Sequence, residues 1–260
     1  MKIAVCMKEV PDASATKRID PQTLRLDRGG GGTLNEFDTH ALEEALKLKE
    51  SQGSGEVVVV SMGPQRALES MRKALAMGAD RVVLVSDDAL AGSDLLATAK
   101  VLAKALERED AELVLFGQQA GDSDGAVLWA AVADLLRLPM ISQVAGLEVA
   151  DGKAKAKRQT EFGYDVIEAP VPCVIAVSDA INEPRYPSLK GIMGAKKKEQ
   201  DVVSLAELGL EAGETGESGS RTSVLALGEA PERGDTKRIE DEGGNSAEKI
   251  VSFLSEKKLI

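Results

Sequence analysis

Four short apolar runs, at residues 2–5, 56–61, 81–85 and 113–116, constrain the fold of this chain more than any other feature. They are rich in Val, Ile and Leu and do not alternate with polar residues, as expected of parallel strands buried on both faces. Segments with apolar residues at helical spacing lie between them. Strands and helices that alternate in this way predict an α/β fold, a Rossmann-like parallel sheet with helices on both faces.

The helical segments have apolar residues every three or four positions, at Phe37, Ala41, Ala45 and Leu48, at Leu68, Met71 and Leu75, and at Leu95, Thr98, Leu102 and Leu106. Their expected boundaries have capping chemistry, with starts at Asn35 (followed by Asp38), Pro64 and Ser93 and an end before Gly78. The capping residues therefore support the boundaries that the periodicity predicts.

The pattern changes after Pro139. Residues 146–150 and 153–159 alternate around Asp151-Gly152 and predict a β-hairpin, with a third strand at 164–168 before an apolar strand at 173–177. Residues 211–220, EAGETGESGS, have the composition of a flexible linker, and a short apolar run (223–227) and an amphipathic helix (247–257) follow. We expect a domain at 1–210, and at 211–260 a linker and an extended C-terminal arm too short to bury a core alone.

Composition limits the classes of partner. The chain has 43 acidic and 32 basic residues, a formal charge of -11, which disfavours nucleic acid and anionic membranes. Cys6 and Cys173 lie in apolar runs without a CxxC pair, which predicts buried free thiols. The N-terminus resembles neither a signal peptide nor a presequence, and no apolar stretch reaches about 18 residues, so a cytoplasmic protein is expected.

Three junctions predict a ligand crevice at the carboxyl ends of the strands: the loop after Val5, residues 61–64 and residues 117–125. The last, within GQQAGDSDGA, combines glycines that permit close backbone approach with a helix start that can bind a phosphate. Asp122 and Asp124 could then accept hydrogen bonds from ribose hydroxyls. Equally, Asp122 or Ser123 could simply cap the helix while the glycines form a turn.

Other motifs favour structural roles. Gly29 to Gly32 follow no strand and precede no Lys-Ser/Thr, so a hairpin end is favoured over a phosphate loop. His40, the only histidine, lies on a helix without a nucleophile motif nearby, which favours a surface or hydrogen-bonded helix histidine over a catalytic base. We expect no catalytic residues and no metal site, so any redox chemistry requires a cofactor.

Residues 179–199, DAINEPRYPSLKGIMGAKKKE, indicate how the chain meets a partner. Pro184 and Pro187 exclude a regular helix or central strand and predict a loop that presents anchors outward. The candidate docking residues are Arg185, Tyr186, Leu189, Ile192, Met193, Lys196, Lys197 and Lys198. The lysines either form a solvated face or steer an acidic partner.

This segment resembles the recognition loop of the electron transfer flavoprotein β subunit family, whose pattern is N-E-P-R-Y/F, a leucine or phenylalanine, I-M and A-K-K-K. The matching residues are Asn182, Glu183, Pro184, Arg185, Tyr186, Leu189, Ile192, Met193 and Ala195 with the three lysines after it. The likeness also covers AVCMKEVPD, ALAMGADR and the C-terminal tail. It implies that Leu189 is the anchor inserted into a dehydrogenase.

The resemblance implies an electron carrier rather than an enzyme: a heterodimer with an α subunit that holds most of one FAD, with AMP in the β subunit. Electrons would pass from acyl-CoA or related dehydrogenases to a membrane quinone reductase, and the tail would embrace the α subunit. The implied cofactor-binding residues are Cys6, Asn35, Glu36, Phe37, Asp38, Met62, Ala120, Gly121, Asp122, Ser123, Asp124 and Gly125. Phe37 either reaches toward the flavin or belongs to the core.

The chain also departs from the family pattern. Mitochondrial members have N-P-F where this chain has Asn35-Glu36-Phe37, and polar residues where it has Ala126, Val127 and Leu128. Flavin-bifurcating members hold a second FAD in the same pocket and usually have D-G-D-T, where this chain has D-S-D-G, which disfavours bifurcation. The alternatives are such a bifurcating subunit or a stand-alone nucleotide-binding protein, against which the apolar tail argues.

Overall fold

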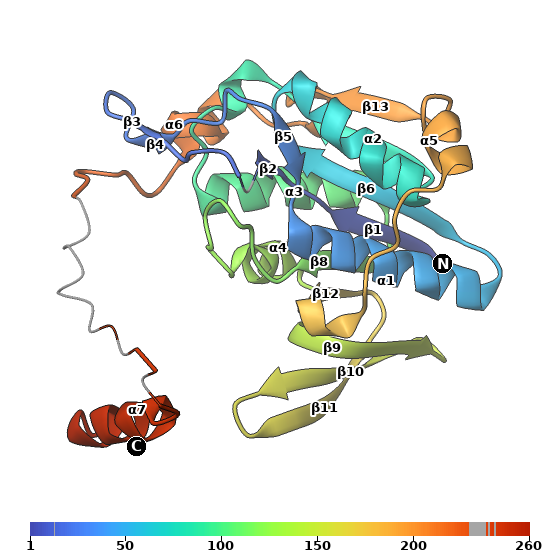
Figure 1. The fold of residues 1–260 in the computed structure, drawn as a ribbon. Helices are drawn as coiled ribbons and strands as arrows, with labels where there is room; N and C mark the ends of the chain where they lie inside the picture. Colours follow the sequence, from blue (N-terminus) through green and yellow to red (C-terminus); the bar gives the residue numbers. More distant parts are fainter. Residues whose placement is uncertain (13, 229–237, 239, 242) are drawn as a thin grey trace. The chain divides into compact units, whose positions relative to one another are not determined.

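A computed structural model describes residues 1–12, 14–228, 238, 240, 241 and 243–260. The chain divides into two compact units, Met1–Ser223 and Val224–Ile260, each described by itself. The first unit is a mixed α/β domain around a large, mostly parallel sheet, as the sequence predicts (Figure 1).

The sheet has nine strands in the order β11-β10-β9-β12-β8-β1-β6-β7-β13. In this spatial order, every neighbouring pair from β9 and β12 through to β7 and β13 is parallel. The pairs β9–β10 and β10–β11 are antiparallel. Their bounds are β1 Lys2–Cys6, β6 Glu56–Met62, β7 Arg81–Val85, β8 Leu113–Gly117, β9 Met140–Ala150, β10 Lys153–Thr160, β11 Gly163–Pro170, β12 Cys173–Val177 and β13 Gln200–Val203. The predicted strands and hairpin are therefore present, and β9 is longer than expected.

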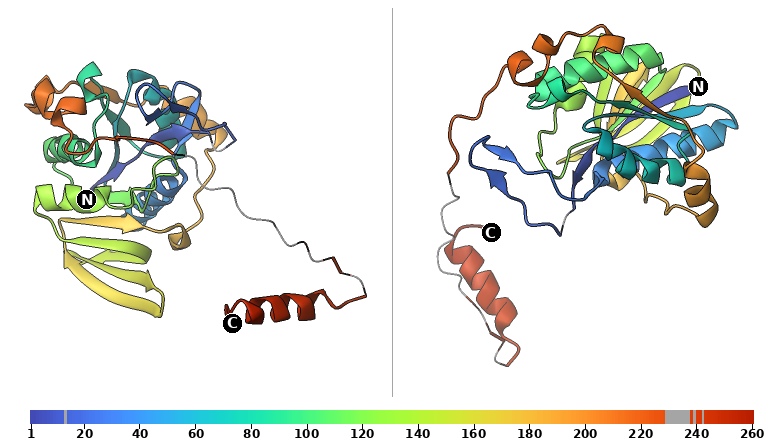
Figure 2. Two further views of the ribbon diagram at one scale, coloured as in Figure 1. Left: turned by 90° about the vertical axis from the view of Figure 1, so that its left-hand side faces the viewer. Right: turned by 90° about the horizontal axis from the view of Figure 1, so that it is seen from above.

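Helices cover both faces of the sheet: α1 (Glu36–Gln52), α2 (Leu68–Met77), α3 (Leu95–Glu109) and α4 (Leu128–Leu136). Residues of α1 and α2 share one core cluster with Ile3 and Val57, and residues of α3 and α4 share the other with Ala4 and Val58. Figure 2 shows the two helix pairs on opposite sides of the strands. Because successive strand residues point to opposite faces, both faces of the central strands are buried, which explains their unbroken apolar runs.

Two expected helix starts differ in detail. Asn35 occupies the N-cap position of α1 but makes no side-chain capping bond. In α3 the N-cap is Asp94, whose carboxylate accepts the Ala97 N–H at 2.9 Å, while the Ser93 hydroxyl donates to the Leu90 carbonyl. A carboxylate one residue later thus replaces the predicted serine cap. Pro64 and Gly78 lie at a helix start and a helix end as predicted.

Residues 211–220 were expected to form a flexible linker, and this is wrong. They contain the short helices η5 (Ala212–Glu214) and α6 (Gly216–Gly219), and the Gly216 N–H donates to the Ser93 hydroxyl at 2.8 Å. A Cβ on Gly216 would lie 2.3 Å from the Ala89 carbonyl oxygen. The glycine therefore serves close packing, which composition alone does not distinguish from linker flexibility. The remaining 3₁₀ helices are η1 Gln65–Ala67, η2 Asp88–Leu90, η3 Asp179–Ile181 and η4 Ala206–Leu208.

An excursion between β1 and α1 carries two small antiparallel pairs. Strands β2 (Glu9–Pro11) and β5 (Gly32–Leu34) pair with each other, and β3 (Ile19–Asp20) and β4 (Arg25–Leu26) form a hairpin beyond them. The glycine run lies between β4 and β5, with Gly32 inside β5. The run connects the β3–β4 hairpin back to β5, whereas the sequence predicts that it forms the end of a hairpin.

The second unit contains helix α7 (Ser246–Glu256), close to the predicted helix at 247–257. Ile250 and Val251 on this helix are exposed, as are Val224, Leu225 and Leu227 in the preceding apolar run. The predicted linker and arm also include residues 229–237, 239 and 242, which lie outside the described residues. Within the described residues, no helix is both long and apolar enough to cross a membrane.

Candidate functional site

A cavity of about 430 Å³ lies beside the carboxyl ends of β1, β6 and β8, where the sequence predicts a ligand crevice. Six of the expected cofactor-binding residues line it: Cys6, Asp38, Met62, Ala120, Ser123 and Gly125. The other six lie outside its lining: Asn35, Glu36, Phe37, Gly121, Asp122 and Asp124. The structure therefore divides the predicted set into six residues that line the cavity and six that do not.

Asn35 is almost fully buried and fastens the glycine-rich loop to the start of α1. Its Nδ2 donates to the Gln119 carbonyl at 2.8 Å, and its Oδ1 accepts the Gly121 N–H at 3.1 Å. These two bonds explain why its side chain does not cap α1. Asn35 acts on the cavity by positioning the loop that forms one wall.

Asp38, in the first turn of α1, connects two strand ends beneath the cavity. Its Oδ2 accepts the Lys8 N–H at 2.8 Å, and it also accepts the backbone N–H of Gly117. Burial raises the pKa of Asp38 to about 7, although these hydrogen bonds and the charge of Lys8 favour the ionised form. The cavity thus has a carboxyl group that changes charge near neutral pH.

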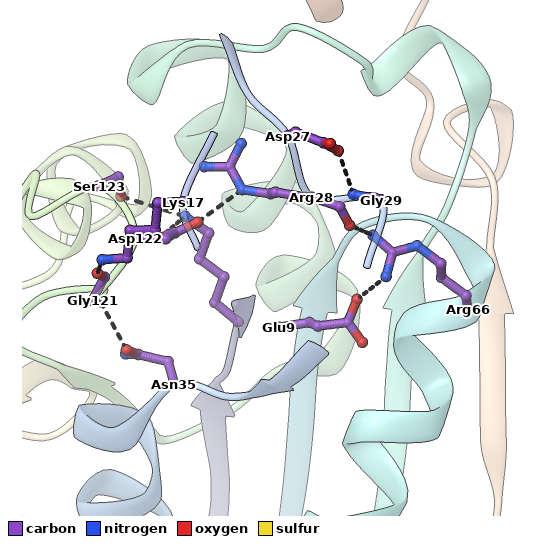
Figure 3. A network of polar contacts seen from close by, with 11 residues as sticks. Glu9, Lys17, Asp27, Arg28, Gly29, Asn35, Arg66, Gly121, Asp122 and Ser123 are labelled. Atoms are coloured by element: carbon purple, nitrogen blue, oxygen red, sulfur yellow. Dashed lines mark hydrogen bonds and ion pairs between the residues drawn. The ribbon is translucent and has the colours of Figure 1, made fainter. Parts of the chain in front are cut away.

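Asp122 is bound by two cations, of which Figure 3 shows Arg28, and it lies outside the cavity lining. Its Oδ1 lies 2.7 Å from Lys8 Nζ and its Oδ2 lies 2.8 Å from Arg28 Nε, and its side chain is only 1% exposed. Burial alone would raise the pKa of Asp122, but the hydrogen bonds and charges of Lys8 and Arg28 outweigh it and lower the pKa. Both carboxylate oxygens are therefore already engaged within the chain.

The alternative in which Asp122 or Ser123 caps the next helix is wrong. Helix α4 begins at Leu128, and its N-cap position is occupied by Val127, without a side-chain capping bond. In the loop that leads to α4, Asp124 and Ala126 have positive φ angles of 44° and 49°. An alanine at such an angle is strained, and strained backbone of this kind is frequent at binding sites.

Sequence reasoning missed several cavity residues: Lys8, Arg28, Gln118 and Trp129. Trp129 Nε1 donates to the Gln118 carbonyl at 3.0 Å, and Gln118 Oε1 is buried without a hydrogen-bond partner among the described residues. A buried acceptor of this kind is normally satisfied, which indicates a site for a donor from a ligand or water. Arg28 could not be found by motif because it lies 94 residues from Asp122 in the sequence.

The predicted docking segment contains a short helix that the sequence reasoning excluded. Pro184 and Pro187 precede helix α5 (Leu189–Ala195), which begins where Ser188 Oγ accepts the Gly191 N–H at 3.0 Å. The prolines prevent the helix from starting earlier but do not act beyond Ser188. The four apolar candidates are exposed, Tyr186 by 92%, Leu189 by 76%, Ile192 by 52% and Met193 by 70%.

Two of the candidate docking residues are used within the chain instead. Arg185 Nε lies 2.7 Å from Glu43 Oε2, and its NH1 lies 2.5 Å from Glu50 Oε1, both acceptors on α1. Lys198 Nζ donates to the carbonyls of Leu75 and Ala79 at the end of α2. Burial of Lys198 lowers its pKa. Lys196 and Lys197 are exposed and remain available to a partner.

His40 and the cysteines have the structural roles that the sequence favours. His40 is buried on α1, and its Nδ1 lies 2.9 Å from the Asn182 carbonyl oxygen. Asn182 Nδ2 in turn donates to the His40 carbonyl and to Glu44. Cys6 and Cys173 are buried free thiols whose pKa values are raised by burial.

Comparison with known proteins identifies the family. Residues 23–208 match the family model described as the electron transfer flavoprotein domain. The electron transfer flavoprotein subunit beta of Mycobacterium tuberculosis (strain ATCC 25618 / H37Rv) is 39% identical over 264 residues, with 99% of each chain covered. This chain belongs to the electron transfer flavoprotein β subunit family.

Two further relatives also match the chain over its full length. The Megasphaera elsdenii electron transfer flavoprotein subunit beta is 35% identical over 271 residues, with 100% of each chain covered. The Acetobacterium woodii protein named caffeyl-CoA reductase-Etf complex subunit CarD is 38% identical over 263 residues, again with 100% of each chain covered.

In this chain, α1 connects the cavity with the predicted docking segment. Its first turn carries Asp38, which lines the cavity, and its later turns carry Glu43 and Glu50, which bind Arg185. Phe37, beside Asp38, is partly exposed rather than enclosed in the core. The cavity and the predicted docking segment therefore both use residues of α1.

Proposed function

We propose that this chain is the β subunit of a heterodimeric electron carrier, with no catalytic residues of its own. It pairs with an α subunit that holds most of one FAD, and the FAD supplies the redox chemistry when bound. The dimer carries electrons from acyl-CoA or related dehydrogenases to a quinone reductase, as in fatty acid β-oxidation. The C-terminal arm packs on the α subunit, Phe37 faces the flavin, and the protein acts in the cytoplasm.

The observation that carries this proposal is the exposed apolar surface of α5. Leu189, Ile192 and Met193 are exposed on a helix whose flanking residues, Arg185 and Lys198, bind α1 and α2. Large apolar side chains held outward by a rigid support are typical of protein docking sites. Family membership makes an electron-donating dehydrogenase the partner that fits this surface best.

AMP is the proposed occupant of the cavity, and the residues present fit it. Leu102, Phe116, Leu128 and Trp129 supply apolar surface for a base, and they contact or belong to one core cluster. Lys8 and Arg28 supply positive charge, and Gln118 Oε1 supplies an unpaired acceptor. A volume of about 430 Å³ lies near the lower end of ligand pockets, which span roughly 300–1,000 Å³.

A second candidate is a flavin-bifurcating subunit that binds a second FAD in the same cavity. The similarity to the subunit of a caffeyl-CoA reductase-Etf complex favours it. The cavity volume and the D-S-D-G sequence at residues 122–125 argue for the smaller mononucleotide.

The test is a nucleotide determination on the heterodimer purified after co-expression with its α subunit. Acid release should yield one FAD and one AMP per heterodimer, and an acyl-CoA dehydrogenase with its substrate should reduce the bound FAD. Two FAD and no AMP would establish the bifurcating alternative. A stable monomer that binds a nucleotide but no flavin, with or without the α subunit, would contradict both.

A further inference from the structure

Helix α5 lies against the carboxyl end of α2 (Figure 1). The backbones of the two helices approach most closely at Gly191. A Cβ added to Gly191 would overlap the carbonyl oxygen of Ala76, which lies in the last turn of α2. Only a residue without a side chain allows α5 to lie this close to α2.

Two further residues hold the same side of the docking segment on α2. Ala195 lies four residues after Gly191 and therefore on the same side of α5. It is only 3% exposed and belongs to the core cluster that contains the last residues of α2. Lys198, just beyond α5, donates to the carbonyls of Leu75 and Ala79. These contacts cover backbone carbonyls at the end of α2, which have no partner within that helix.

The opposite side of α5 carries the exposed apolar residues. Leu189 and Met193 are also four residues apart, and each precedes a residue of the contact side by two positions. Two positions in an α-helix correspond to a rotation of about 200°. Leu189 and Met193 therefore lie nearly opposite Gly191 and Ala195. The contact with α2 thus determines the direction in which these two side chains project.

The chain before α5 gives the helix little freedom to compensate for a shift. Arg185 is bound to α1 through Glu43, and Gly191 contacts α2 six positions later. Pro187 lies between these two contacts and restricts the backbone there. A displacement at Gly191 must therefore also move Leu189, which is part of the same short helix.

We propose that Gly191 is a positioning residue for docking, because its contact with the Ala76 carbonyl sets the direction in which Leu189 and Met193 meet a partner protein. This inference rests on the proposed function, since it takes α5 as the surface that meets the dehydrogenase. A larger residue at position 191 displaces α5 from α2 and leaves the exposed apolar side chains themselves unchanged. Complementarity to the partner, and with it affinity, then decreases.

The experiment compares Gly191→Ala with Gly194→Ala in the heterodimer with the α subunit. Gly194→Ala is the matched control, because it is the same substitution on the same helix, and a Cβ at Gly194 would have no described atom within 4 Å. Stopped-flow reduction of the flavin is measured over a range of acyl-CoA dehydrogenase concentrations. It gives the half-saturating dehydrogenase concentration and the rate at saturation. Flavin content and thermal unfolding show that each heterodimer is folded.

Gly191→Ala should raise the half-saturating concentration by about fivefold or more and change the rate at saturation by less than about twofold. Gly194→Ala should change both quantities by less than about twofold. A double-mutant cycle with Leu189→Ala separates positioning from general destabilisation. If Gly191 acts through the apolar side chains, its effect on the half-saturating concentration should be at least about twofold smaller once Leu189 is truncated.

An unchanged half-saturating concentration for Gly191→Ala, or an equal effect with and without Leu189, would overturn the inference, while a defect of Leu189→Ala alone would still support docking by α5. If Leu189→Ala has no defect either, α5 is not the docking surface, and the proposed docking fails together with the inference. Should Gly191→Ala give too little heterodimer, Ala195→Ser adds a single atom to the same contact. It should raise the half-saturating concentration less than Gly191→Ala would, and no change would overturn the inference.

Discussion

Arg185 and Glu43, 142 residues apart in the sequence, are joined through both the side chain and the backbone of the arginine. Glu43 Oε2 accepts Nε at 2.7 Å and the Arg185 backbone N–H at 3.1 Å, and Oε1 accepts NH2 at 3.1 Å. The Glu43 side chain is only 5% exposed. This pair fixes the chain just before α5. The helix that carries the exposed apolar residues therefore begins at a defined position.

The first prediction concerns this pair. Arg185→Gln leaves the buried Glu43 carboxylate without its cation, and we expect the free energy of unfolding to fall by about 2 kcal/mol. Amide hydrogen exchange at residues 182–195 should accelerate as well. Lys190→Gln is the matched control, because it removes the same charge from an exposed site on α5. Equal stability of the two variants in urea unfolding would show that the pair does not hold the segment.

The second prediction separates the three lysines that the sequence groups together. Charge reversal at Lys196 and Lys197 should slow association with an acidic dehydrogenase at low salt and have less effect at high salt. Lys198→Ala should instead lower stability by about 1 kcal/mol, because Lys198 binds the carbonyl of Leu75 in the last turn of α2 and that of Ala79 just beyond it. Stopped-flow flavin reduction at several ionic strengths and urea unfolding measure the two effects. A salt-dependent association defect in Lys198→Ala would contradict this division.

The third prediction compares Gly117, the last residue of β8, with Gly125 in the loop that follows this strand. A Cβ on Gly117 would lie 2.5 Å from the Phe37 carbonyl carbon and 2.6 Å from Asp38 Oδ1, whereas one on Gly125 would have only an ordinary contact with Leu95. Gly117→Ala should therefore destabilise the protein by about 2 kcal/mol or more, and Gly125→Ala should be nearly neutral. Gly125→Phe should fold but fill the cavity and lower AMP content. Thermal unfolding and acid release of AMP provide the measurements.

Local sequence patterns were sufficient to predict the sheet. Val57 to Val60 are unexposed on both faces, so the unbroken apolar run at 56–61 follows directly from the parallel architecture. The hairpin followed from the turn residues Asp151 and Gly152. Helix α5 was missed because the prolines act only on their own surroundings, and Ser188 restores a helix start immediately after them.

The candidate site was predictable only where its residues lie close together in the sequence. The glycine-rich loop was located from its own composition, but the roles of Asp122 and Arg185 depend on partners 94 or more residues away. Asp122 looks like a ribose acceptor until Lys8 and Arg28 are placed beside it. Such long-range pairs leave no local pattern, which is why the charged wall of the cavity emerged only from the structure.

The fourth prediction uses the pH dependence of Asp38. Its folded-state pKa of about 7 lies above the ordinary 3.8, so the folded protein binds a proton that the unfolded chain releases between about pH 4 and pH 7. The contribution of Asp38 to the free energy of unfolding is therefore fully present below about pH 4. It is lost as pH rises through 7, by on the order of 4 kcal/mol in total. Asp38→Asn should remove this decline in urea unfolding between pH 5 and 8. A variant with the parent's pH slope would show that Asp38 ionises normally.

The last prediction concerns docking by α5. Leu189 is 76% exposed and Ala is a better helix former than most residues, so Leu189→Ala should leave stability, flavin spectrum and AMP content unchanged. Truncating a central apolar anchor costs about 2 kcal/mol or more of binding free energy, which corresponds to at least about a tenfold loss of affinity. Reduction of the flavin by a dehydrogenase at subsaturating concentration should therefore slow by about tenfold, while the rate at saturation stays the same. Val166→Ala is the matched control, because Val166 is a comparably exposed apolar residue on β11, away from α5. If Leu189→Ala matches this control at every dehydrogenase concentration, α5 is not the docking surface, and the assignment of the partner loses its structural support.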